Sequence, residues 1–267
     1  MINVPDAIMG MRFAALAGQV YNDSEFSLDQ DTIYAQTHFL DPERAMGSAA
    51  KTIITHNSDQ PLNVDRLMSV PSVDWWSCNC EVWTNPRAGA LPLGLLNSTG
   101  LVDAMNKIPL SLKPETLAAR LQQPRLAYLN CHPGSDVYPQ KFNERTDVNN
   151  RFNHRPWVTV EKYKSDRPLP FSVFFNKLAL HAYCFSPRGA GVDCHRTWEA
   201  ITMGCIPIVK RDPVMLPFAA FPILFVDDWA EVTVDMLRAR HPEIAAKFQT
   251  TRHMMEFKYW EEKICNA

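Results

Sequence analysis

The sequence has no long apolar run, no excess of charge of either sign and no early GxGxxG motif. A membrane span needs about 20 consecutive apolar residues, so none is predicted. The formal net charge of −2 gives no overall basic field, which argues against nucleic acid or an anionic membrane as partner. The missing GxGxxG disfavours an enzyme that binds a dinucleotide cofactor. A polyanionic ligand would therefore need a local site.

Cysteine is present in a pattern that predicts neither a disulfide framework nor a zinc site. The number of cysteines, seven, is odd, and several of them lie in apolar runs. We therefore expect a cytoplasmic protein, or the soluble part of a longer one. Cys78 and Cys80 are separated by one residue, with no second CxxC or HxxxH nearby. Buried thiols are the expected outcome.

Short apolar segments alternate with helical patterns, which predicts an α/β fold with parallel sheets. The expected strands are 32–36, 52–55, 73–78, 90–93, 125–131, 157–160, 183–186, 206–209 and 223–226. The expected helices are 41–50, 113–123, 143–153, 170–181, 193–203 and 233–264. We expect two Rossmann-like lobes that face each other across a cleft. Open parallel sheets bind ligands beyond the carboxyl ends of their strands, so loops of both lobes should point into it.

The lobes are expected at residues 1–110 and 111–245, joined by a linker within 97–114. Residues 246–267 are expected to form a helix that packs back on the first lobe. The second lobe contains the most informative segment, AYCFSPRGAGVDCHRTWEAITMGCIPIVK at residues 182–210.

This segment combines a strand, a glycine-containing loop and a helix start. A strand ends at Ser186, and Gly189 and Gly191 permit a tight turn with positive φ and close approach of a ligand. Asp193 stands where the N-cap of the next helix is expected. The free N–H groups of that helix start would attract an anion.

Charged side chains near this helix start suit a phosphorylated, ribose-bearing ligand. Arg188 and Arg196 can bind phosphate oxygens. Glu199 lies one turn further along the face of His195 and Arg196, where its carboxylate can accept hydrogen bonds from two ribose hydroxyls. Residue types alone favour a solvated and internally paired helix face, and the loop glycines and flanking buried strands make the ligand-binding interpretation equally good.

The run FSPRGAGVDCHRTWEAITMGCIPIVK, followed by FPILFVDDWAEVT, resembles the C-terminal signature of exostosin-like (GT47-type) inverting glycosyltransferases, which have a GT-B fold. THNSDQPL, LPLGLLNS and FKYWEEKI are similar to segments of compact family members from bacteria and large algal viruses. The resemblance is dense over residues 185–233 and looser from Thr52 onward, and residues 1–50 carry little of it.

The resemblance implies a UDP-sugar donor bound by the second lobe and a glycan hydroxyl as acceptor. Glu199 would then contact the ribose, and the diphosphate or sugar would lie against Arg188 and Arg196. The loop would be shaped by Ser186, Gly189 and Asp193. Two further arginines are candidates for the diphosphate, with a solvated helix face as the alternative: Arg145 and Arg151. The donor sugar is open; a neutral pentose or hexose fits best, with UDP-xylose as first choice.

An inverting transfer needs a general base, which is expected from the first lobe. Asp59, in the loop after a buried strand, is the first choice, with an Asx-turn as the alternative. His56 is the second choice, with a backbone-bonded histidine as the alternative; His38 and Asp23 are weaker candidates. His195 is expected to be a structural partner of the loop.

Acceptor contacts are predicted in the first lobe as well. Trp75 and Trp76 could stack on sugar rings, although core packing is the commoner fate of such residues. Asn57 and Asn97 follow strands and could bind sugar hydroxyls, or act only as turn residues.

A divalent metal is not expected, because arginines and a helix dipole can stabilise a leaving phosphate. The only DxD, at residues 29–31, precedes a strand, and Asp227-Asp228 resembles a strand-end cap. No other cofactor is predicted. Two alternatives to the transferase stay open: a non-catalytic module that binds UDP-sugars or glycans, and another nucleotide-sugar enzyme on the same fold.

Overall fold

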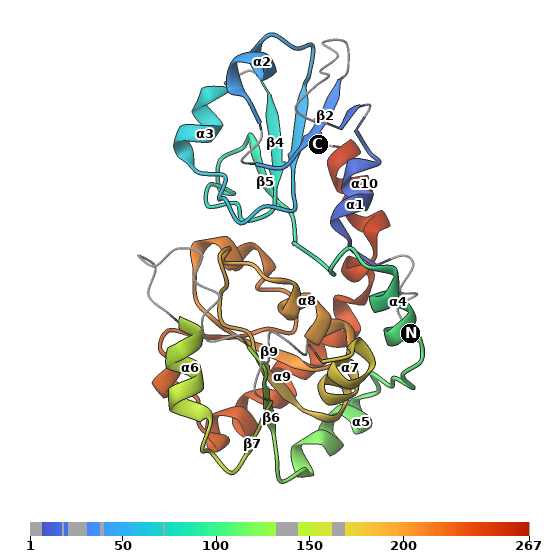
Figure 1. The fold of residues 1–267 in the computed structure, drawn as a ribbon, viewed down its shortest axis with the longest axis vertical. Coiled ribbons are helices and arrows are strands. Elements are labelled where there is room, and N and C mark those ends of the chain that lie inside the picture. Colours follow the sequence, from blue (N-terminus) through green and yellow to red (C-terminus); the bar gives the residue numbers. More distant parts are fainter. Residues whose placement is uncertain are drawn as a thin grey trace.

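Two five-stranded parallel sheets, one in each half of the chain, form the framework of the protein (Figure 1). The computed structural model describes residues 7–17, 19–20, 31–37, 40–71, 73–131, 144–161 and 169–266. The first sheet contains β1 (Gln19–Val20), β2 (Thr32–Ala35), β3 (Thr52–Thr55), β4 (Asp74–Ser77) and β5 (Ala88–Ala90). The second contains β6 (Ala127–Leu129), β7 (Val158–Val160), β8 (Tyr183–Phe185), β9 (Ile206–Lys210) and β10 (Leu224–Val226). The predicted α/β class with parallel sheets is confirmed.

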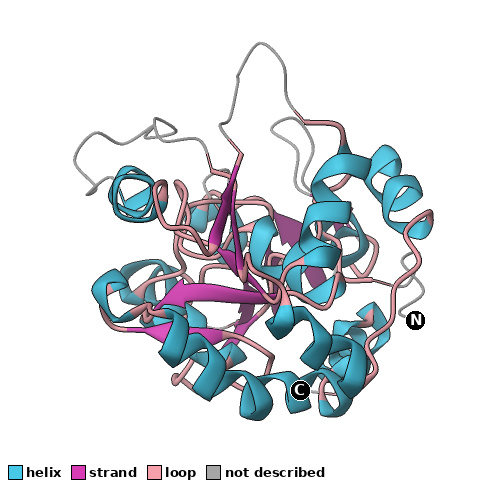
Figure 2. Ribbon diagram, turned by 90° about the horizontal axis from the view of Figure 1, so that it is seen from below, coloured by secondary structure: helices cyan, strands magenta, loops and turns pink. Residues whose placement is uncertain are grey.

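Helices surround both sheets (Figures 1 and 2). The α-helices of the first half are α1 (Gly10–Ala14), α2 (Pro42–Met46), α3 (Val64–Ser69) and α4 (Thr99–Asn106). Those of the second half are α5 (Pro114–Ala119), α6 (Glu144–Phe152), α7 (Phe171–Leu180), α8 (His195–Thr202), α9 (Val234–Thr250) and α10 (Phe257–Cys265). Short 3-10 turns are η2 (Arg120–Gln122), η3 (Pro213–Phe218), η4 (Trp229–Glu231) and η5 (Arg252–Met255). No helix in the described parts is long and apolar enough to cross a membrane.

The first sheet has its strands in chain order, β1-β2-β3-β4-β5. Right-handed crossovers between consecutive parallel strands place their helices on one face, and α2 and α3, which follow β2 and β3, lie together on that side (Figure 1). The register gives each face its own apolar row: Ile33, Ile53 and Trp75 on one face, Tyr34, Ile54 and Trp76 on the other. The first row packs in a core with α2 and α3, and the second in a core with α1 and α10.

The helix α10 therefore covers the sheet face that the crossovers leave bare. Its residue Phe257 meets Phe13 of α1 with ring centroids 5.1 Å apart. The ammonium of Lys263 lies 5.8 Å from the centre of the Trp76 ring. Glu256, just before α10, forms a β-bridge with Ala7. The end of the described chain thus completes the first lobe.

The second sheet has the order β10-β9-β8-β6-β7, so the chain reverses direction across it between β6 and β8. Crossovers of one hand then place α6 on the opposite face from α7 and α8 (Figure 1). All residues of β6 and β8 are buried. In an open α/β sheet, ligands bind beyond the strand ends at such a reversal, which here is where the loop after β8 begins.

Three expected elements differ from the structure. The strand predicted at 90–93 lies at Ala88–Ala90, where Gly89 pairs with Trp76; a Cβ on Gly89 would lie 2.3 Å from the Trp76 ring. The predicted linker contains α4, which packs against α7. The helix predicted over 233–264 is interrupted at Thr251, which ends α9 before η5 and α10 begin.

Candidate functional site

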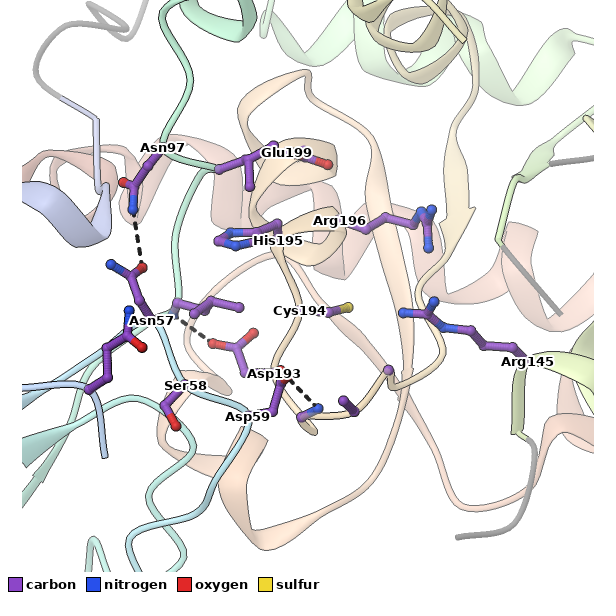
Figure 3. Close-up of a pocket in the computed structure, with 16 residues that line it drawn as sticks. Asn57, Ser58, Asp59, Asn97, Arg145, Asp193, Cys194, His195, Arg196 and Glu199 are labelled. Atoms are coloured by element: carbon purple, nitrogen blue, oxygen red, sulfur yellow. Dashed lines mark hydrogen bonds between the residues drawn. The ribbon is translucent and has the colours of Figure 1, made fainter. Parts of the chain in front are cut away.

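A cavity of about 700 Å³ lies between the two lobes, at the carboxyl ends of strands from both sheets (Figure 3). This volume suits a ligand of drug or cofactor size. The first lobe contributes Gln36, Asn57, Ser58, Asp59, Leu93 and Asn97. The second lobe contributes Arg145 of α6, Gly191 and Cys194 of the loop after β8, and His195, Arg196 and Glu199 of α8. Residues predicted from the sequence on both lobes thus meet in one cavity.

The loop after β8 is fixed by buried polar contacts. Ser186 is buried, and its Oγ lies 2.9 Å from Oγ1 of Thr197. Asp193 was expected to cap α8, but the N-cap is Cys194, which provides no side-chain cap. The Asp193 carboxylate instead accepts Nε1–H of Trp198 at 2.8 Å. It also accepts the backbone N–H of Leu93, from the first lobe, at 2.7 Å. Asp193 therefore joins the two lobes.

The pKa of Asp193 reflects the competition between burial and these donors. Burial raises the pKa to about 7, whereas the N–H groups of Leu93 and Trp198 lower it. Each lobe thus supplies donors that favour the ionised carboxylate. The loop makes three more contacts to the first lobe: Gly191 N–H to Asp59 Oδ1 at 3.2 Å, Asp193 N–H to Asn79 Oδ1 at 2.9 Å, and His195 Nδ1 to Gly94 O at 2.8 Å.

The glycines of the loop after β8 allow other groups to pack closely against the backbone, and they do not adopt unusual backbone angles. The positive-φ glycines of the described chain are Gly94 and Gly204, so the positive φ expected at Gly189 and Gly191 is wrong. A Cβ on Gly189 would lie 2.5 Å from Nη2 of Arg145, and one on Gly191 would lie 3.1 Å from Oδ1 of Asp59. Their missing side chains let protein groups approach the loop. Gly204, at φ +68°, directly follows Met203, the C-cap of α8.

One end of the cavity is cationic. Figure 3 shows the guanidinium groups of Arg145 and Arg196 extending toward the same region, on the same side of Cys194. Arg145 donates from Nε to the carbonyl of Arg188 at 3.0 Å. The buried Nε of Arg196 has no hydrogen-bond partner among the described residues. Its electrostatic neighbours are the thiols of Cys184, Cys131 and Cys194, followed by Glu199.

Glu199 lies deeper on α8 and is 8% exposed. Burial raises its pKa to about 7, and the nearby Arg196 charge lowers it. No described residue donates a hydrogen bond to its carboxylate. A buried carboxylate that receives no hydrogen bond from the described residues can accept hydrogen bonds from the hydroxyl groups of a ligand.

Two other predicted donor residues lie outside this cavity. Arg188 faces a separate hollow of about 380 Å³, together with Glu144 and Lys210. Its own backbone N–H donates to Oε1 of Glu144 at 3.1 Å. Arg151 points to another side of α6, where it forms an ion pair with Asp147 at 3.6 Å. The structure therefore does not bring Arg188 and Arg151 to Glu199.

Three first-lobe candidates belong to the core. His56 is fully buried, with Nε2 2.9 Å from the carbonyl of Pro92 and Nδ1 3.3 Å from Oδ1 of Asn57. Burial lowers its pKa to about 4, so the ring is neutral near pH 7. Trp75 and Trp76 are 1% and 8% exposed and do not line the cavity. The alternative interpretations given for these residues therefore hold: His56 is a histidine bonded to the backbone, and Trp75 and Trp76 are packed in the core.

Asn57, Asn97 and Asp59 do line the cavity on the first-lobe side (Figure 3). Asn57 has φ +51°, and its Oδ1 accepts from Nδ2 of Asn97 at 3.2 Å. Its own Nδ2 donates to the hydroxyl of Tyr34 at 3.0 Å. Asp59 is exposed, and its Oδ1 accepts the N–H of Gly191.

No group of three His, Cys, Asp or Glu residues in the described chain is arranged to hold a metal ion. Of the DxD, Asp31 pairs with Lys51 at 3.3 Å, and residues 29–30 lie outside the described residues. Asp227 pairs with Arg211 at 2.7 Å, and Asp228 caps η4. The candidates Asp23 and His38 also lie outside the described residues.

Sequence reasoning missed two features of the site. Asn79 holds the backbone of Asp193 and donates from Nδ2 to the carbonyl of Ser58 at 2.9 Å. The sequence signal that could have identified Asn79 is its position one residue past the expected strand, between two cysteines. The exposure of His195 to the cavity was also missed. No protein-family model matches the chain.

Proposed function

We propose that the protein is an inverting glycosyltransferase of GT-B type that moves a sugar from a UDP-sugar to a hydroxyl of a glycan. The observation that carries this proposal is the Arg196 guanidinium. It faces a cavity at the strand-order reversal, beside Arg145, and its buried Nε has no hydrogen-bond partner among the described residues. A buried guanidinium nitrogen without a partner favours a ligand with acceptor oxygens, and a diphosphate bound at Arg196 supplies them.

The neighbouring groups support a nucleotide over a simple phosphate. Glu199 follows Arg196 by one turn and has acceptor capacity for the two hydroxyls of a ribose. As the bond to the sugar breaks, negative charge develops on the leaving diphosphate, and Arg145 and Arg196 would stabilise it without a metal ion. The resemblance of residues 185–233 to exostosin-like glycosyltransferases supports the same assignment.

The first-lobe side of the cavity supports a neutral donor sugar. It presents the amides of Gln36, Asn57 and Asn97 and the carboxylate of Asp59. Amides bind sugar hydroxyls, whereas a uronate would meet Asp59, and no lysine or arginine is among the described first-lobe residues that line the cavity. UDP-xylose or another neutral UDP-sugar is therefore the proposed donor.

The test is release of UDP from a panel of UDP-sugars, with water and simple glycosides as acceptors, combined with calorimetric UDP binding. We expect release from a neutral donor. Glu199→Ala should weaken UDP binding about 10- to 100-fold, because two charge-assisted hydrogen bonds to the ribose are lost. Glu262→Ala, on the exposed side of α10, is the control and should leave binding unchanged. UDP binding without release from any donor would instead indicate a non-catalytic binding module.

A further inference from the structure

His195 is held in one tautomer by the first lobe. Its Nδ1 lies 2.8 Å from the carbonyl oxygen of Gly94. A carbonyl can only accept, so Nδ1 carries the proton and Nε2 keeps its lone pair. No described residue bonds to Nε2, and the half-buried ring lines the cavity. The contact with Gly94 thus orients a proton acceptor inside the proposed active site.

His195 and Arg196 are consecutive residues that point to opposite ends of the cavity. In Figure 3 the imidazole extends toward Asn57 and Asn97, whereas the guanidinium of Arg196 extends toward Arg145. Successive residues of a helix start diverge by about 100°. An inverting attack brings the acceptor hydroxyl to the face of the sugar opposite the leaving phosphate. If the arginines mark the diphosphate, the attacking hydroxyl lies on the His195 side.

Asp59, the base predicted from the sequence, is less well placed to take the proton. Its side chain is exposed, and its Oδ1 already accepts the N–H of Gly191. It nevertheless acts electrostatically on His195 and favours the protonated ring. This is the role of a carboxylate that stabilises an imidazolium formed during reaction.

On the basis of the proposed function, we propose that Nε2 of His195 is the general base and that Asp59 is a positioning residue that stabilises its protonated form. The acceptor hydroxyl oxygen forms a bond to the anomeric carbon of the donor sugar. The bond from that carbon to the β-phosphate oxygen breaks, and its electron pair leaves with UDP. The hydroxyl proton moves to Nε2, and the imidazolium later returns it to water.

The charge state of His195 agrees with this role. Burial lowers its pKa below the usual 6.5, while the bond to Gly94 and the charge of Asp59 raise it. The other titratable groups around it are His56 on the first-lobe side and Asp193, Arg196 and Glu199 on its own loop and helix. A base must be unprotonated, so activity should fall as pH drops through the His195 pKa and level off above it.

The decisive variant is His195→Asn, measured in the full chain. The Asn amide can still donate to the carbonyl of Gly94 but has no group in place of Nε2. We expect kcat for UDP release from the active donor to fall about 100- to 10,000-fold, with UDP affinity within threefold. Asp59→Asn keeps the shape of the carboxylate without its charge. It should lower kcat less and move the acid limb of the pH profile to lower pH.

The possible results are distinct. If the wild-type chain releases UDP and His195→Asn keeps at least half of kcat, the inference is overturned and the proposed function stands. If Asp59→Asn abolishes release while His195→Asn does not, Asp59 is the base. If the wild-type chain binds UDP but releases none from any donor, the proposed function fails and this inference fails with it. A parallel loss of UDP binding in His195→Asn would show a structural role and also overturn it.

Discussion

The two sheets have the same number of strands and the same parallel pairing, but they differ in strand order. The second sheet reverses between β6 and β8, whereas the first runs in chain order. The converging arginines and Glu199 belong to the lobe with the reversal. The first lobe adds amides, one exposed carboxylate and backbone carbonyls. Strand order therefore separates a lobe suited to bind an anion from a lobe that positions groups around it.

The same difference decides what each sheet needs for stability. A reversed order places crossover helices on both faces, so the second sheet is covered by its own connections. In the first sheet the crossover helices α2 and α3 pack on one face, and α1 and α10 cover the other. Two substitutions and one change of pH probe this contrast between the lobes, from the largest free-energy effect to the smallest.

Phe257→Ala should give the largest effect, on stability. Its ring packs on Phe13 over the otherwise bare face of the first sheet. Removing a buried phenylalanine costs about 3–5 kcal/mol. Chemical denaturation followed by tryptophan fluorescence measures the loss. Lys258→Ala, at 77% side-chain exposure on the same helix, should cost less than about 0.5 kcal/mol. Equal losses would show that α10 does not stabilise this face.

Arg196→Met should weaken UDP binding by about 10- to 100-fold, because charged hydrogen bonds contribute about 1.5–3 kcal/mol. Arg151→Met is a matched control, since the sequence favoured both arginines but the structure places Arg151 on another side of α6. Isothermal titration should show less than a twofold change for it. A similar loss in both variants would contradict the placement of the diphosphate.

Binding of UDP-glucose should depend on pH through Glu199. Burial raises the Glu199 pKa to about 7, and the ionised form is the better acceptor for ribose hydroxyls. Affinity is then complete above pH 8 and falls by up to about tenfold, or about 1.4 kcal/mol, per pH unit below 7. Glu199→Gln should remove most of this slope, although Asp193 also has a pKa of about 7 and remains. An unchanged slope in Glu199→Gln would show that another group controls binding.

Much of the fold could be predicted because its elements carry local signals. The buried strand at Thr52–Thr55 and the capped helix α2 follow directly from an apolar run and from Asp41, which accepts the N–H of Glu43. The order of strands in the sheets had no such signal. It depends on long-range packing, such as that of Phe257 on Phe13, which no local pattern records.

The directions of single side chains in the site were also hard to predict, because they too depend on contacts between residues far apart in the sequence. Glu199 could be chosen from its spacing after Arg196, because both lie on one helix. Arg188 and Arg151 looked equally suitable, but the direction of a side chain depends on neighbours far away in the sequence. The contact that fixes His195 joins it to Gly94, about one hundred residues earlier. A tautomer set by such a contact cannot be read from the motif.

The cover of the first sheet by α10 has a consequence for how the chain is made. The strands β1 to β5 leave the ribosome before the second lobe, yet one of their apolar faces is covered only by α1 until residues 257–265 have been synthesised. Until then Tyr34, Ile54 and Trp76 are open to other chains, and contacts of such sequence separation form slowly. Of the two lobes, the one that is synthesised earlier is thus the one whose core is completed last.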